Sequence, residues 1–292
     1  MIYADPDAYL SSPAKRVLLF GMSGLGKTRA SNLLRAQGDW FHYSVDYRIG
    51  TRYMGEYISD MFKREAMKIP LLRALLMSDS VYIASNITFD NLAPLSTYLA
   101  CPGDPAKGGL TMAEYCRRQD QHLHAEMAAM LDTTRFIERA KDLYGYPHFI
   151  CDTSGSICEV VEATDPADPV MTEIAAHHLL VWIKGTEAHR DELCRRFDRA
   201  PKPMYFRPAF LSQIWGEFLA LDGKPENRID PDAFLRFGYA RLLDSRQPRY
   251  ASMARWGVTV TAEEMSDVAS PADFDALIAR AINRRMREAT GA

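Results

Sequence analysis

One octapeptide of this sequence combines glycines, a lysine and a threonine at a spacing that binds phosphate. Residues 21–28 read Gly-Met-Ser-Gly-Leu-Gly-Lys-Thr and fit the pattern G-x-x-x-x-G-K-[ST]. Glycines let the backbone turn tightly, so that its N–H groups point at an anion. The Lys27 ammonium would contact the β- and γ-phosphates of a nucleotide, and the Thr28 hydroxyl would bind Mg²⁺. The nucleotide contacts expected here are Gly21, Ser23, Gly24, Leu25, Gly26, Lys27, Thr28 and Arg29, with Lys27 also in a catalytic role.

The elements on either side of residues 21–28 fit this role. The apolar run 17–20 predicts a strand before them, and the apolar spacing of residues 30–34 predicts a helix after them that ends near Gly38. The N-terminus of that helix would add its dipole to the binding of an anion. An ordinary glycine-rich turn is the alternative, and the order of strand, loop and helix disfavours it.

A carboxylate at the end of another expected strand is the candidate metal ligand. The apolar run 148–151 closes in Asp152, where a carboxylate can hold the hydration shell of Mg²⁺ beside Thr28. Thr28 and Asp152 are therefore the expected ligands of the metal. An aspartate that caps a helix after Gly155 is the alternative.

Residues 152–155 raise a second interpretation of the nucleotide. They read Asp-Thr-Ser-Gly and match D-x-x-G, an element that lies beside magnesium in GTPases. A GTPase would also be expected to carry an [NT]-K-x-D motif that recognises guanine, and the sequence has none. ATP is therefore the expected nucleotide, with Mg²⁺ as its metal.

Candidate substrate ligands follow the strand expected at 41–45. Asp46 comes directly after it, and Arg48 and Arg52 follow. A carboxylate at that edge could take a proton from an acceptor hydroxyl, so Asp46 is expected to bind the substrate and to act in catalysis. Arg48 or Arg52 could hold an acidic group of the substrate. A solvated turn with exposed arginines is the alternative.

Two further catalytic candidates lie on a helix expected after the fourth strand. Arg195 and Arg199 are four residues apart, so both guanidinium groups project from one helix face. Such a pair could stabilise a phosphoryl group during transfer when a lid closes. A solvated face is the alternative, because acidic residues lie nearby at 191, 192 and 198.

Short apolar runs alternate with helical patterns along the whole chain. The runs lie at 17–20, 41–45, 148–151, 179–183 and 258–260, with a weaker sixth at 81–84. This alternation predicts an α/β fold in three layers, with a parallel sheet of about five strands. The pattern of residues 21–28 adds that the fold is of the P-loop type.

We expect one domain, 1–292, with two additions to its core. Residues 47–147 read as a large, mainly helical insertion after the second strand that caps the substrate site at the carboxyl edge of the sheet. Residues 186–256 read as a lid with accessory helices. Thr111 and Ser270 are expected helix caps.

Composition limits the class of protein and its partners. Hydrophobic residues make up 47% of the 292 residues and charged residues 25%, which is ordinary for a globular protein. The net charge of −3 gives no reason to expect nucleic acid or a membrane as a partner. Five cysteines without a C-x-x-C pair, and the lack of a leader or membrane-spanning run, predict a cytoplasmic protein. The expected partners are a nucleoside triphosphate and a small-molecule acceptor; the oligomeric state is left open.

The order of these features along the chain resembles that of the P-loop kinases of small molecules. The features are the 21–28 loop, Asp46, Asp152, the arginines of 195–199 and the final strand before Ser270. The likeness is to the shikimate, gluconate and nucleoside monophosphate kinases, and it covers roughly residues 15–46, 147–210 and 255–288. The resemblance implies that Asp46 contacts the substrate hydroxyl, that Arg195, Arg199 and less certainly Arg196 are lid arginines, and that 261–263 lies near adenine. The sequence departs from shikimate kinases after the third strand, where a glycine cluster is replaced by 152–155, and in its longer insertion.

These observations predict an ATP- and Mg²⁺-dependent phosphotransferase acting on a small hydroxylated or phosphorylated metabolite. Two alternatives stay open. The first is a P-loop ATPase or nucleotide-dependent switch that signals through the helical insertion to a protein partner, which the D-x-x-G residues favour. The second is a nucleotide-binding module without chemistry, which the presence of both Lys27 and Thr28 disfavours.

Overall fold

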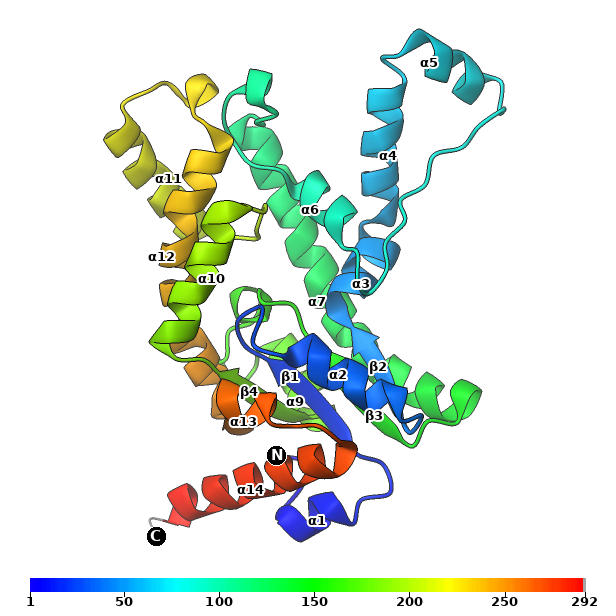
Figure 1. Cartoon of the computed structure of the whole chain (residues 1–292), viewed down its shortest axis with the longest axis vertical. Helices are drawn as coiled ribbons and strands as arrows, with labels where there is room; N and C mark the ends of the chain where they lie inside the picture. The colour runs from blue at the N-terminus through cyan, green and yellow to red at the C-terminus, as the bar shows by residue number, and fades with distance from the viewer. Residues whose placement is uncertain (291–292) are drawn as a thin grey trace. The chain divides into compact units, whose positions relative to one another are not determined.

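The computed structural model describes residues 1–290 and contains one parallel sheet. Its strand order is β2-β3-β1-β4-β5, and all four neighbouring pairs are parallel. The strands are β1 (Arg16–Phe20), β2 (Trp40–Ser44), β3 (His148–Asp152), β4 (Leu179–Lys184) and β5 (Val258–Thr261). The α/β class and the five expected strands are therefore confirmed (Figure 1).

The weak sixth strand expected at 81–84 is wrong. These residues have no regular secondary structure, and the Tyr82 side chain is 89% exposed. The run is apolar, but it lies in an exposed connection and not in the buried sheet, so apolar composition alone was misleading here.

The remaining regular elements are helices. They are α1 (Pro6–Leu10), α2 (Lys27–Ala36), α3 (Val45–Arg48), α4 (Gly55–Ala66), α5 (Pro70–Met77), α6 (Ala93–Leu99), α7 (Met112–Tyr144), α8 (Ile157–Val160), α9 (Pro169–His177), α10 (Glu187–Arg199), α11 (Pro208–Asp222), α12 (Pro231–Ala254), α13 (Ala262–Ser266) and α14 (Pro271–Thr290). A π-helical turn covers Ile49–Tyr53, and 3₁₀ turns cover Pro105–Lys107 and Glu226–Arg228. Of the helices within residues 1–290, none combines the length and apolar composition that a bilayer span requires.

The chain divides into two compact units. The first comprises Met1–Val45, Met130–Ala200 and the residues from Gly238 onward, and it contains the whole sheet. The second comprises Asp46–Ala129 and Pro201–Phe237, and its regular elements are helices. Helices α7 and α12 each begin in the second unit and continue into the first. The second unit includes residues of both predicted additions to the core, the insertion 47–147 and the lid segment 186–256. The exact limits of these two additions stay predictions.

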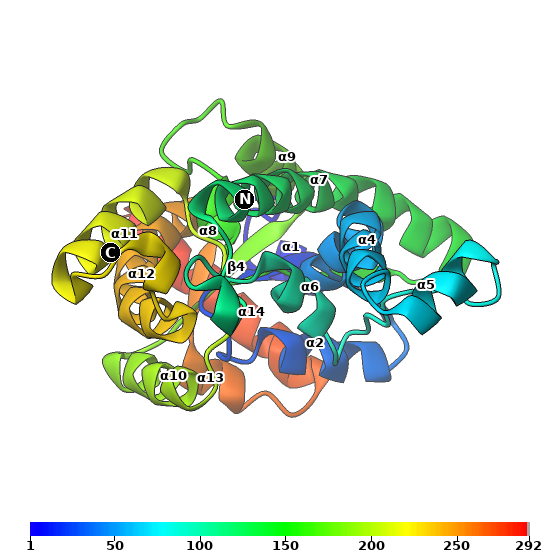
Figure 2. The same ribbon diagram turned by 90° about the horizontal axis from the view of Figure 1, so that it is seen from above.

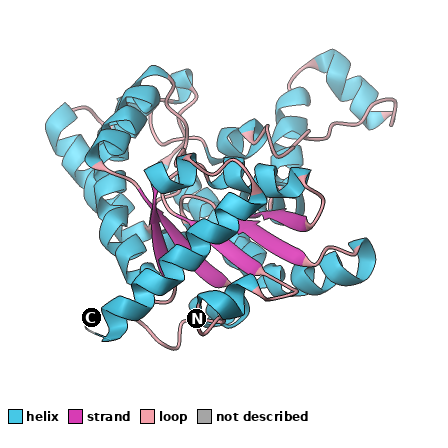
Figure 3. Cartoon of the chain, turned by 60° about the horizontal axis from the view of Figure 1, so that its bottom comes forward, coloured by secondary structure: helices cyan, strands magenta, loops and turns pink. Residues whose placement is uncertain are grey.

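Side chains of β2 show how the first unit forms three layers. Phe41 and Tyr43 face Phe136 of α7, with ring centroids 6.2 and 5.1 Å away. Trp40 projects from the opposite face and meets Phe274 of α14 edge to face at 5.9 Å. In Figures 2 and 3, α2 and α14 accordingly cover one face of the sheet, while α9 and the C-terminal part of α7 cover the other.

Both expected helix caps are in place, and a third helix has a cap of the same kind. The Ser270 hydroxyl accepts from the Asp273 N–H at 3.2 Å at the start of α14, and the Thr111 hydroxyl accepts from the Glu114 N–H at 3.3 Å at the start of α7. Thr186 caps α10. Local capping chemistry therefore determines where these helices begin.

The second unit has an aromatic core of its own. Phe234 of α12 meets Trp215 and Phe218 of α11 edge to face, with centroids 4.9 and 5.6 Å away. Phe206 lies 6.2 Å from the Phe234 ring. These rings bury large apolar surfaces and pack α11 against α12.

Candidate phosphate-binding site

The segment between β1 and α2 turns through three glycines with positive φ. The angles are 134° at Gly21, 84° at Gly24 and 97° at Gly26, values that residues with a side chain rarely adopt. Space is also limited at Gly21, because a Cβ there would lie 2.6 Å from the carbonyl oxygen of Ile183 in β4. The glycines therefore permit a tight loop at the carboxyl end of β1.

The loop leads directly into the N-terminus of α2. Gly26 is the N-cap residue, and no side chain makes a capping hydrogen bond there. The first N–H groups of this ten-residue helix are thus not taken up by a side-chain cap. Together with the helix dipole they form an environment that favours an anion.

Lys27 places its positive charge on this loop. Its side-chain ammonium donates to the carbonyl oxygens of Gly21 at 2.9 Å and Met22 at 3.1 Å, and the residue is 6% exposed. Ser23, Gly24 and Thr28 are exposed on the same loop. A buried ammonium beside exposed loop residues fits the terminal phosphates of a nucleotide.

Elements from other parts of the first unit lie close to the loop. A Cβ built on Gly24 would lie 3.0 Å from Leu193 Cδ2 of α10, and one on Gly26 would lie 3.7 Å from Met265 Cγ of α13. A Cβ on Gly155 would lie 2.5 Å from Ser23 Oγ, so the Ser23 hydroxyl would have to move to admit a side chain there. The turn after β3, the helix α10 and the helix α13 therefore border the loop.

Asp152 ends β3 at the same edge of the sheet, where its backbone is in register with Leu19 of β1. The residue is 5% exposed, and its Oδ1 has no hydrogen-bond partner among the described residues. A buried carboxylate oxygen without a partner is costly unless another group binds it. Oxygen donors are what Mg²⁺ prefers, so Asp152 and the Thr28 hydroxyl fit this metal.

Helix capping by Asp152, the alternative interpretation, is wrong. The short helix α8 begins after Ser156, and no side chain makes a capping hydrogen bond to it. Within residues 1–290, His, Cys, Asp and Glu side chains form no group of three that could hold a metal ion by themselves. Mg²⁺ is commonly held by one or two protein carboxylates together with substrate phosphates, so a single carboxylate is sufficient for such a site.

His42 is a neighbour of Asp152 that the sequence analysis missed. Its Nε2 lies 3.7 Å from Asp152 Oδ2, and the side chain is fully buried. His42 of β2 is paired with Ile150, two residues before Asp152. Because side chains alternate along a strand, this register places His42 and Asp152 on one face, but the register becomes known only from the sheet.

The turn after β3 is held by side chains of α12. The Tyr250 hydroxyl donates to the carbonyl oxygen of Gly155 at 2.5 Å, and burial raises the pKa of Tyr250 well above its ordinary value. Arg246 donates from Nε to Glu159 Oε1 at 3.1 Å. Burial opposes the charged form of Arg246, but Tyr250 and Glu159 raise its pKa above the ordinary value, so the guanidinium stays charged.

The expected lid arginines lie on the surface of α10. Arg195 pairs with Glu192 at 2.9 Å and is 66% exposed, and Arg199 is also exposed. Arg190 of the same helix instead binds both carboxylate oxygens of Asp244 in α12, at 2.5 and 2.7 Å. Arg190, Asp244 and Met22 line a cavity of about 400 Å³ beside the loop. The catalytic roles of Arg195 and Arg199 stay predictions.

The expected substrate residues belong to the second unit. Asp46 lies in α3 directly after the chain leaves β2, the guanidinium carbon of Arg48 lies 5.6 Å from the ring centroid of Tyr53, and Arg52 is exposed in the π-helical turn. Arg29, an expected nucleotide contact, donates to the carbonyl oxygens of Ser266 and Val268. The roles given to these residues stay predictions.

No known family model matches this sequence, and no curated protein matches it. A search of solved structures finds a shikimate kinase from Bacteroides thetaiotaomicron at 14% sequence identity, covering 95% of this chain and 99% of that chain with a TM-score of 0.36. That score is too low for the likeness to carry an argument. The α/β assignment therefore rests on the parallel sheet and on the loop between β1 and α2.

Proposed function

We propose that this protein is a cytoplasmic, ATP- and Mg²⁺-dependent phosphotransferase that acts on a small hydroxylated or phosphorylated metabolite. The observation that carries the proposal is the Lys27 ammonium, held on a glycine loop beside an α2 N-terminus that no side chain caps. This arrangement matches the chemistry of a triphosphate tail, which needs backbone donors and a fixed positive charge.

Each site residue has a separate role in the proposed phosphoryl transfer. Lys27 and the loop amides bind the β- and γ-phosphates, while Thr28 and Asp152 would hold Mg²⁺, which would neutralise phosphate charge when bound. Asp46 orients the acceptor hydroxyl and accepts its proton. Arg48 or Arg52 binds an acidic group of the acceptor, and the expected lid residues Arg195 and Arg199 stabilise the transferred phosphoryl group.

One observation favours a second function, a P-loop ATPase or nucleotide-dependent switch. Gly155, the glycine of the D-x-x-G residues, approaches the loop so closely that a Cβ on it would lie 2.5 Å from Ser23 Oγ. A turn in that position could respond to loss of the γ-phosphate. Steady ATP hydrolysis without an acceptor, stimulated by a protein and not by metabolites, would support this second function.

Replacing Lys27 tests nucleotide binding. We expect Lys27→Ala to weaken the affinity for ATP with Mg²⁺ at least tenfold in calorimetry, because the lost charged hydrogen bonds contribute about 1.5–3 kcal/mol. Lys224→Ala removes a surface lysine that pairs with Asp222 and should leave the affinity unchanged. If the wild-type chain gives no heat with ATP or GTP, or if Lys27→Ala binds as the wild type does, the proposal is wrong.

Transfer itself needs a separate experiment. Labelled ATP incubated with the protein and a metabolite library should yield a labelled acceptor, and Lys27→Ala should not. Release of labelled phosphate alone, at the same rate with every metabolite, would favour the ATPase over the kinase.

A further inference from the structure

Tyr250 of α12 touches three neighbouring strands or their ends around the glycine loop. Its ring centroid lies 6.3 Å from that of Phe20, which directly precedes Gly21, and 6.5 Å from that of Trp182 in β4. Its hydroxyl donates to the carbonyl oxygen of Gly155, in the turn after β3. The residue is fully buried, so these contacts are not shared with solvent.

A second polar contact holds the same turn four residues further on. Arg246 and Glu159 form an ion pair at 3.1 Å, and the side chains are only 9% and 1% exposed. Arg246 lies one helical turn before Tyr250. One face of α12 therefore binds both Gly155 and Glu159.

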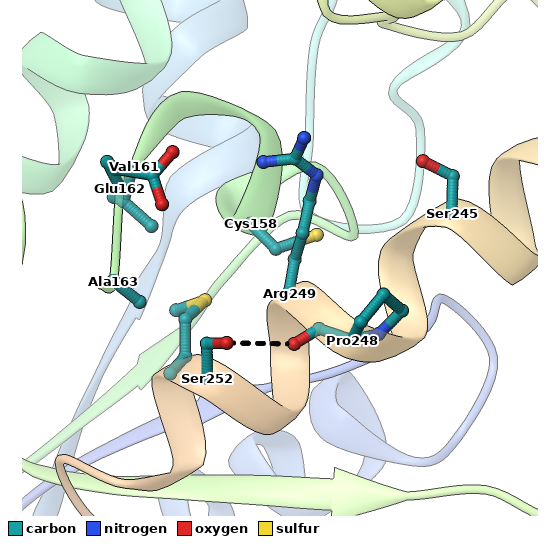
Figure 4. A pocket seen from close by; sticks show the side chains of 9 residues that line it. Cys158, Val161, Glu162, Ala163, Ser245, Pro248, Arg249 and Ser252 are labelled. Atoms are coloured by element: carbon teal, nitrogen blue, oxygen red, sulfur yellow. Dashed lines mark hydrogen bonds between the residues drawn. The ribbon is translucent and has the colours of Figure 1, made fainter. Parts of the chain in front are cut away.

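Packing against the turn is incomplete on the adjoining part of α12. A cavity of about 220 Å³ is lined on one side by Cys158 and residues 161–163 and on the other by α12 (Figure 4). Figure 4 shows the Arg249 side chain rising from α12 into this cavity, and the Ser252 hydroxyl donating to the Pro248 carbonyl within the helix at 3.0 Å. Tyr250 and Arg246 lie on the same stretch of α12 as Pro248 and Arg249, so their polar contacts hold the turn and α8 next to this cavity.

The position of the turn after β3 determines where Asp152 and Gly155 lie relative to the glycine loop. Asp152 ends β3 with a carboxylate oxygen that has no partner among the described residues, and Gly155 lies against Ser23 of the loop. A displacement of the Gly155 carbonyl would change the distance between the turn and the loop, and it would also move Asp152, because only two residues separate Gly155 from Asp152. The Tyr250 hydroxyl is the donor that fixes this carbonyl.

We propose that Tyr250 is a positioning residue for phosphoryl transfer, which holds the turn of Asp152 and Gly155 at the distance from the loop that Mg²⁺ and nucleotide require. The inference rests on the proposed function, since it assigns Tyr250 to the nucleotide site. Tyr250 acts through the backbone of Gly155 and does not contact the reacting groups.

The test compares two Tyr→Phe changes on the same helix. Tyr250→Phe keeps the ring and removes the donor, whereas Tyr239→Phe removes a hydroxyl that makes no hydrogen bond within residues 1–290, from a ring stacked on Phe197 at 3.8 Å. Calorimetry with ADP, in Mg²⁺ and in EDTA, gives the factor by which Mg²⁺ strengthens binding. We expect Tyr250→Phe to reduce this factor about fivefold without changing affinity in EDTA by more than twofold.

Turnover supplies a second measurement, and Gly155→Ala a second variant. Tyr250→Phe should lower kcat for ATP about tenfold with less than a twofold change in KM, and Tyr239→Phe should change neither. Gly155→Ala changes the contact between turn and loop from its other side, because its Cβ would lie 2.5 Å from Ser23 Oγ, so that either the Ser23 hydroxyl or the turn must shift; it should also reduce the Mg²⁺ factor. Melting curves by circular dichroism verify that each variant is folded.

The outcomes separate this inference from the proposed function. In the first outcome, the wild-type chain binds ADP more tightly in Mg²⁺, and Tyr250→Phe and Gly155→Ala keep the same Mg²⁺ factor as Tyr239→Phe. Tyr250 then has no positioning role, and the proposed function stands. If the wild-type chain binds no nucleotide, the proposed function and the inference both fall.

Discussion

Asp152 is the single residue whose surroundings bear most directly on function. Its Oδ1 is buried without a hydrogen-bond partner among residues 1–290, which is unfavourable for the folded protein unless a ligand compensates. We expect Asp152→Asn to reduce the strengthening of ATP binding by Mg²⁺ at least tenfold while leaving thermal stability unchanged or raised. Calorimetry with and without Mg²⁺ and a melting curve measure the two effects.

Asp165→Asn is the matched control for this prediction, since it removes the charge of an exposed aspartate in the connection before α9. It should alter neither quantity. An Asp152→Asn protein that melts well below the wild type but keeps its full response to Mg²⁺ would show that the carboxylate is structural.

Residues differ in how far they could be found from sequence. The loop residues Gly21 to Thr28 are consecutive, so their pattern is visible without a fold. Tyr250 and Gly155 are 95 positions apart, and their hydrogen bond depends on where α12 lies in the first unit. The sequence contains no periodic signal that would pair them.

The helices and strands also differ in whether local sequence or tertiary packing determines them. The strands β1 to β5 were predictable because each is a short apolar run that becomes buried. Helix α12 was not predicted as one helix of 24 residues: it contains Pro248 and buries residues on several sides, so no single apolar stripe marks it. Its length depends on packing in both units.

A pH effect is expected from the junction of α9 with β4. His178 is fully buried, and burial lowers its pKa from 6.5 to about 3; its Nδ1 donates to the Ile174 carbonyl at 3.1 Å. Between these two pKa values the unfolded chain binds a proton that the folded chain does not. Stability should therefore be complete above pH 6.5 and fall as the pH is lowered toward 3, by up to about 1.4 kcal/mol per pH unit.

Urea unfolding at pH 7 and pH 5 measures this effect. His178→Asn should lose less stability than the wild type between the two pH values, because it removes the buried titrating group. His124→Asn, at a side chain that is 71% exposed, should leave the difference unchanged. An identical pH dependence in His178→Asn and the wild type would contradict the assignment.

At the scale of the whole molecule, the sequence predicts one domain with insertions, which stays a prediction, and spatial contacts divide the described chain into two compact units, each built from separate stretches of the chain. Local patterns could not reveal this division, because Asp46–Ala129 and Pro201–Phe237 join through side chains far apart in sequence. The bond from the Lys107 ammonium to Asp230, at 2.6 Å, is one example. Such pairings between distant segments become visible only in three dimensions.

The N-terminal residues of the first unit and α14 are joined by a partly buried polar cluster, which gives a prediction for stability. Asp275 of α14 accepts from the Lys15 ammonium at 2.5 Å and from the Tyr9 hydroxyl at 2.7 Å. Lys15 precedes β1, at the end of the sheet opposite the glycine loop. Asp275→Asn should therefore lower the free energy of unfolding by about 1–3 kcal/mol without changing the affinity of the folded protein for ATP.

Urea unfolding gives the stability change, and calorimetry with ATP and Mg²⁺ at low temperature gives the affinity. Asp267→Asn, at an exposed position eight residues earlier, is the control and should change neither value. If Asp275→Asn weakened ATP binding while the protein remained folded, this end of the sheet would be coupled to the loop. We assume that ATP binding depends only on the carboxyl edge of the sheet and that the Asp275 cluster at the opposite end contributes only to stability. That result would show the assumption to be wrong.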